Sequence, residues 1–99
     1  MKTTKELEKL LCEETDVVKW FGGINQQAPK FLVFYIACEL QIAMNAKNKS
    51  VILSDNKKYT HKCMKKVGLI DSQGILTQDG IDIYNALLKE KYDFDGKYV

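Results

Sequence analysis

The residues most able to do chemistry are gathered in one short stretch of the sequence. Between positions 57 and 66 the chain holds five lysines, its single histidine His61, and Cys63. Dense lysines attract anionic partners, of which nucleic acid is a leading example. Histidine and cysteine can bind a metal, or act together as base and nucleophile. The stretch therefore suits anion binding, metal binding or nucleophilic catalysis.

Metal binding and catalysis are poorly supported by the spacing of these residues. His61 and Cys63 are two positions apart, which places them about 200° apart around a helix. The sequence has no second Cys or His pair to complete four zinc ligands. Glu13 and Glu14 are paired acids, but their polar setting shows no sign of the burial that activates a carboxylate. We expect no enzymatic activity, no metal and no cofactor.

Anion binding fits the way in which the side chains are distributed around the predicted helix. A helix over residues 54–67 has a basic half and a largely apolar half that includes Tyr59, Cys63 and Met64. The apolar half is expected to pack on the domain, while the basic half faces solvent and binds duplex DNA. A solvated lysine face with no ligand is the alternative. The predicted DNA-binding residues are Asn56, Lys57, Lys58, His61, Lys62, Lys65 and Lys66.

The positive charge of the chain is concentrated in the same part of the sequence. The formal net charge is +2, but residues 47–67 hold seven lysines against Asp55, a net +6, between flanks of −1 and −3. All fifteen basic residues are lysine and none is arginine. Because an A+T-rich genome depletes most arginine codons, the composition suggests a virus, a phage, a plasmid or another mobile element, or a host of low G+C content, as the source.

The elements before this segment are predicted to be helical. Thr3 should cap a helix that continues to Phe21 and stops at Gly22-Gly23, with a division at Thr15-Asp16 into two shorter helices. Pro29 fits the first turn of a second, apolar helix that runs to about Ala46 and forms the centre of the core.

The elements around and after the basic helix are predicted to include short strands. Val51 to Leu53 should form a strand, and Gly68 should end the basic helix in a left-handed conformation. Leu69-Ile70 and Ile75-Leu76 should form a hairpin, and Thr77 should cap a last helix to about Lys91. The expected fold is a single domain, residues 1–99, mainly α with a small β component (α+β): about four helices plus a short β-hairpin.

Residues 56–88 resemble a winged-helix DNA-binding domain. In many MarR-like and PadR-like repressors a recognition helix often ends in Gly-Leu-Ile, a β-hairpin wing follows, and Leu-Thr-x-x-Gly enters the next helix. Here these motifs are Gly68-Leu69-Ile70 and Leu76-Thr77-Gln78-Asp79-Gly80. The resemblance implies that the basic helix enters a groove of duplex DNA. The predicted wing is very short and carries Asp71 in place of basic residues.

The cysteines and the longest apolar run indicate a reducing, aqueous environment. Three widely spaced cysteines imply no disulfide framework, and Cys38 and Cys63 are expected to be buried, reduced thiols. The longest apolar run, residues 31–38, is far shorter than the roughly 20 residues that span a bilayer. The N-terminus has no signal-peptide pattern. We therefore expect no membrane association and a cytoplasmic location, in the host cytoplasm for a viral protein.

Two functions remain open from the sequence. The first is a small DNA-binding regulator that uses helix 54–67 and forms a homodimer through its terminal helices. The alternative is a protein-interaction module or inhibitor that binds no nucleic acid. Its partner would be a host or virion protein that contacts the aromatic tail through Tyr92, Phe94 and Tyr98.

Overall fold

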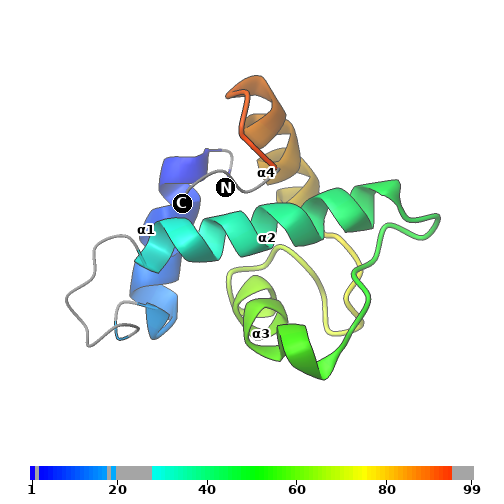
Figure 1. The fold of residues 1–99 in the computed structure, drawn as a ribbon, viewed down its shortest axis with the longest axis horizontal. Helices are drawn as coiled ribbons and strands as arrows, with labels where there is room; N and C mark the ends of the chain where they lie inside the picture. Colours follow the sequence, from blue (N-terminus) through cyan, green and yellow to red (C-terminus); the bar gives the residue numbers. More distant parts are fainter. Residues whose placement is uncertain (2, 18, 20–27, 95–99) are drawn as a thin grey trace.

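The computed structural model describes residues 1, 3–17, 19 and 28–94, and this part of the chain is mainly helical (Figure 1). Its elements, in chain order, are α1 (Thr4–Glu14), α2 (Ala28–Asn45), a 3-10 helix η2 (Asp55–Lys57), α3 (Lys58–Lys66) and α4 (Gln78–Lys89). The mainly helical class predicted from the sequence is therefore confirmed.

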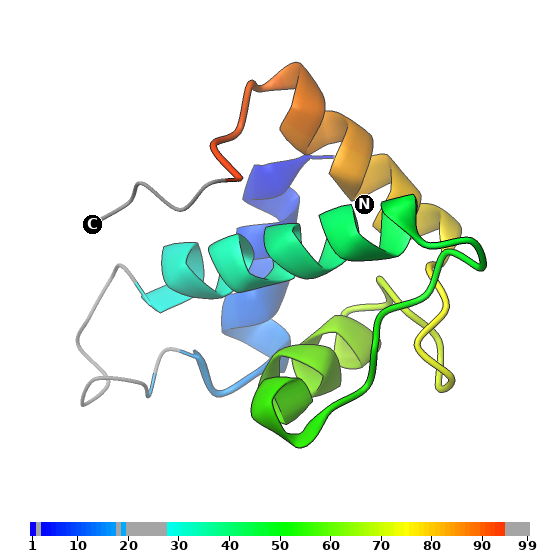
Figure 2. The same ribbon diagram turned by 45° about the vertical axis from the view of Figure 1, so that its right-hand side comes forward.

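Helix α2 is the centre of the core, as its apolar sequence predicts. Leu32, Ile36 and Leu40 are completely buried, and α1, α3 and α4 all pack against this helix. Figures 1 and 2 show α4 on one side of α2 and α3 on the other. None of the helices in the described residues has both the length and the apolar character that a bilayer-spanning helix needs.

Helix α1 begins where its sequence predicts and ends at the predicted division. The Thr3 hydroxyl accepts a hydrogen bond from the Glu6 N–H at 3.1 Å, which satisfies one of the free donors of the first turn. Thr15 follows the helix, and its hydroxyl donates to the Leu11 carbonyl. The predicted continuation to Phe21 and the stop at Gly22-Gly23 lie outside the described residues.

The predicted strand at Val51–Leu53 is wrong. The residue before this segment, Ser50, makes a single antiparallel bridge with Ile75. Beside this bridge, the Val51 N–H donates to the Gly74 carbonyl at 2.9 Å. Ile52 is 73% exposed and Leu53 52% exposed, so these branched side chains do not pack on a sheet. Branched residues form strands only where a partner strand and a packing surface are present.

The predicted hairpin is not formed by regular strands. A single antiparallel bridge joins Ile70 to Leu76, and the chain turns between them at Gly74, which has φ +85°. The Asp71 carboxylate accepts from the N–H groups of Gln73 and Ile75 at 2.8 and 3.0 Å. Because helix ends lie close on both sides, this segment has no room for a longer ladder.

The two ends of the segment 69–76, which connects α3 to α4, have the local structures that the sequence predicts. Gly68 has φ +83°, and the Leu69 N–H donates back to the Met64 carbonyl at 2.8 Å, which is the Schellman ending of a helix. Thr77 caps α4 by accepting from the Gly80 N–H at 3.2 Å. Both ends of the segment are therefore fixed by local hydrogen bonds.

The start of the aromatic tail packs on the domain. Tyr92 and Phe94 are half-buried against the core, and the Phe94 ring lies 5.9 Å from the Tyr84 ring and 5.4 Å from the Tyr92 ring. Residues 95–99, which include Tyr98 and the Asp-Gly pair, lie outside the described residues.

Candidate nucleic-acid interface

Helix α3 is amphipathic in the structure, as the sequence predicts. Cys63 and Met64 are buried against the domain. The exposed side carries four lysines of the predicted interface: Lys58, Lys62, Lys65 and Lys66. Lys58, Lys62 and Lys65 recur at intervals of four and three residues and therefore share one face.

His61 does not face solvent, so this part of the prediction is wrong. Its side chain is buried, and its Nε2 lies 2.5 Å from Oε1 of Glu39 on α2. On the helical wheel His61 is near the boundary between the basic and apolar halves, where a polar partner on a neighbouring element decides its position. Glu39 provides that partner.

Glu39 also binds Lys57 and so joins α2 to the start of the basic helix. The Lys57 Nζ lies 2.8 Å from Glu39 Oε2, and Glu39 is only 3% exposed. A buried carboxylate needs such partners, because an isolated buried charge is costly. The sequence analysis did not single out Glu39. Its signal was a charged residue directly after the apolar run 31–38, on the helix expected to be most buried.

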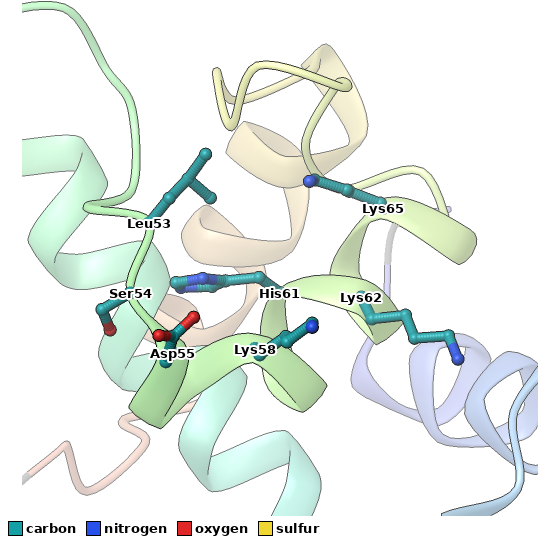
Figure 3. Close-up of a pocket in the computed structure, with 7 residues that line it drawn as sticks. All are labelled: Leu53, Ser54, Asp55, Lys58, His61, Lys62 and Lys65. Carbon is teal, nitrogen blue, oxygen red and sulfur yellow. The ribbon is translucent and has the colours of Figure 1, made fainter.

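Three of the four exposed lysines, together with His61, border a groove of about 470 Å³ between α3 and the preceding loop. Figure 3 shows the His61 ring pointing from α3 toward this loop. Lys65 extends toward the same loop, whereas Lys62 extends away from it (Figure 3). The groove is thus open, partly apolar and bordered by positive charge. Its lining residues are Leu53, Ser54, Asp55, Lys58, His61, Lys62 and Lys65.

The other end of the basic face meets acidic residues. Lys62 and Lys66 line a second cavity of about 400 Å³ together with Glu13, Glu14 and Asp16. Carboxylates at this border reduce the local positive potential. The strongest positive region is therefore expected near Lys58 and Lys65, on the side of the groove.

A hydrogen bond crosses this acidic border. The Tyr59 hydroxyl donates to the Asp16 carboxylate. This bond lowers the pKa of Asp16 below its usual range. Burial, and then the same hydrogen bond, raise the pKa of Tyr59 well above its usual value. Helix α3 is thereby linked to the segment that follows α1.

Asn56 and Lys57 lie apart from the groove. They line a third cavity of about 490 Å³ with Tyr35, Cys38 and Glu39. The seven predicted site residues are thus not one continuous set. Lys58, Lys62 and Lys65 share the groove with the buried His61, Lys66 lies toward α1, and Asn56 and Lys57 lie toward α2.

The three cysteines differ in exposure. Cys63 is buried, as predicted, whereas Cys38 is only half-buried and Cys12 is exposed. Burial is the main factor that raises the pKa of each thiol, and Glu8 and Glu39 add to it for Cys12 and Cys38 respectively. Within the described residues, no group of three or more His, Cys, Asp or Glu side chains is placed to hold a metal ion.

Comparisons of the chain with protein-family models, with curated proteins and with solved structures gave no match.

Proposed function

We propose that this protein is a small regulator that binds duplex DNA through the exposed face of α3. The observation that carries the proposal is the alignment of Lys58, Lys62 and Lys65 on one exposed face of a helix whose other side is anchored in the core. Ammonium groups gathered on one helix face gain affinity for DNA by displacing the counterions condensed on phosphates.

The distribution of charge around the molecule agrees with binding by this face. Residues 78–91, which form α4 and its end, hold three acids against two lysines, whereas α3 holds four lysines and no acid; α4 lies on the other side of α2 from α3 (Figure 2). A molecule with its charges separated in this way is oriented by the field of an anionic partner. The resemblance of the α3–turn–α4 sequence to winged-helix repressors supports the same mode of binding.

The proposal is tested by the salt dependence of binding to random-sequence duplex DNA. With three to five phosphate contacts, log affinity should fall against log salt with a slope of roughly −3 to −5. Replacement of Lys58, Lys62 and Lys65 by Gln should flatten the slope by about 3, since each lost contact removes about 0.9.

A matched control removes the same charge elsewhere. Lys5 and Lys9 on α1 and Lys89 on α4 are exposed, and their replacement by Gln should change the slope much less. Equal effects of the two triple variants would show that DNA binding depends on the net charge of the protein and not on the α3 face. Failure of the folded wild-type protein to bind duplex DNA at low salt would overturn the proposal.

The alternative partner, a host or virion protein, stays a prediction. Tyr92 and Phe94 contribute to the packing of this domain, and Tyr98 lies outside the described residues. A homodimer, an origin in a virus or mobile element and a cytoplasmic location likewise stay predictions.

A further inference from the structure

The groove beside α3 contains a titratable side chain that the proposed lysine contacts do not use. His61 lines this groove, and its Nε2 is bound to the buried Glu39 carboxylate at 2.5 Å. With Nε2 occupied, Nδ1 is the ring nitrogen that can accept another proton. A histidine held in this way by a carboxylate can change its charge without leaving its place.

The charges around His61 come from each neighbouring segment. From α2, Glu39 favours the protonated imidazole, but Lys57 of η2 shares this carboxylate and offsets part of its effect. The α3 lysines that line the groove, Lys58, Lys62 and Lys65, oppose protonation. Asp55 of η2 also lines the groove, and its carboxylate favours the protonated imidazole. Burial of the ring also disfavours its charged form.

An anion in the groove would change this balance. It would neutralise the field of the lysines that oppose protonation and would itself attract a charged imidazole. By linkage, a ligand that favours the protonated form must bind more tightly when protons are more abundant.

We propose that this groove binds a phosphate group of nucleic acid and that binding takes up a proton at His61. The inference rests on the proposed function, because the phosphate belongs to the DNA on the α3 face. The proton comes from solvent and adds to Nδ1, while Nε2–H stays bound to Glu39. The resulting positive charge lies between the Glu39 carboxylate and the phosphate.

The chain is well suited to a test because few other groups titrate near neutrality. His61 is the only histidine. All three thiols have a raised pKa and keep their protons in this range. The N-terminal amine is bound to Asp79 of α4 at 3.3 Å, outside the groove.

The experiment measures the dissociation constant of a synthetic duplex with hydroxyl ends at about pH 6 and about pH 8, at constant ionic strength. Because such a duplex has no terminal phosphate, its phosphates are all phosphodiesters, which do not change their charge between these two pH values. We expect affinity about three- to tenfold tighter at the lower pH. The His61→Gln variant should still bind, with a pH effect of less than about twofold.

A second measurement needs no variant and covers the case in which His61→Gln does not fold. Calorimetric titration of the wild-type protein near pH 7, in two buffers of different ionisation enthalpy, should show net proton uptake on binding. Equal affinity at both pH values, no buffer dependence, or a pH effect that persists in folded His61→Gln would each overturn this inference and leave DNA binding intact. No binding at either pH would overturn the proposed function as well.

Discussion

At the scale of single residues, Glu39 joins helix α2 to the basic segment. It is buried on α2 and holds both Lys57 and His61. Hydrogen bonds to a charged group contribute more than neutral ones, particularly away from water. Glu39 therefore fixes where α3 begins relative to α2, and with it the position of the exposed lysines.

Replacement of Glu39 by Gln should lower the free energy of unfolding. Gln keeps the size of the side chain but loses the charge that both partners use, so we expect a loss of about 1–3 kcal/mol. The measurement is urea denaturation followed by circular dichroism.

The Lys57→Gln variant is the control for this prediction. The Lys57 side chain is 47% exposed, so its loss should cost less than about 1 kcal/mol. If Lys57→Gln were as damaging as Glu39→Gln, the contribution of the buried His61 contact would be negligible.

At the scale of elements, the junction between α3 and α4 depends on two glycines for different reasons. Gly68 has φ +83° and open space around the position of a Cβ. Gly80 is in the first turn of α4, where a Cβ would lie 2.3 Å from the Leu69 carbonyl oxygen. Gly68 is thus needed for its conformation, and Gly80 for the close approach of two backbones.

The two alanine variants should therefore differ in their effects. Gly68→Ala should cost about 1–2 kcal/mol, the usual penalty of a left-handed residue with a Cβ. Gly80→Ala should cost at least as much, about 1–3 kcal/mol or more, because backbone atoms must move apart. Both values can be measured by thermal or urea unfolding.

Nuclear magnetic resonance separates the two mechanisms. In Gly80→Ala, the amide signals of residues 68–70 and 77–81 should shift together, because α4 must move away from Leu69. In Gly68→Ala the shifts should stay near the end of α3. A Gly80→Ala variant as stable as the wild type would show that the junction is looser than the structure indicates.

At the scale of the whole molecule, a few contacts join segments that are distant in the sequence. The N-terminal amine binds Asp79, Thr4 binds Glu90, and Tyr59 binds Asp16. Together with the packing on α2, these contacts place the α1 end, α3 and α4 around one core. The Tyr59–Asp16 contact links helix α3 to the residues that follow α1.

The Tyr59–Asp16 contact predicts how stability depends on pH. Because the pKa of Tyr59 is raised in the folded protein, its contribution is present below the unfolded value of about 10 and is lost as the pH rises through the folded value. Because the pKa of Asp16 is lowered, its contribution is present above about 3.9 and is lost as the pH falls through the folded value.

The Tyr59→Phe variant isolates this contribution from those of the other titrating groups. The difference in stability between wild type and variant should be constant near neutrality and should shrink in both strong alkali and strong acid. Urea unfolding across this pH range gives the difference directly. A difference that did not change with pH would mean that Tyr59 acts through packing alone.

Most of the helical elements and their ends follow from patterns in the sequence. The caps at Thr3 and Thr77 and the left-handed Gly68 were predicted because each depends on a few consecutive residues. The exposure of Lys58, Lys62, Lys65 and Lys66 was predicted for a similar reason, since the helical period fixes which side chains share a face.

The tertiary structure alone decided the features that need a distant partner. His61 is buried because Glu39 of α2 lies opposite, and no local pattern around His61 shows that carboxylate. Residues 51–53 are not a strand because the 70–76 segment pairs only with Ser50, through a single bridge at Ile75. Local hydrogen bonds and periodicity are properties of neighbouring residues, whereas burial and strand pairing depend on which segments the fold brings together.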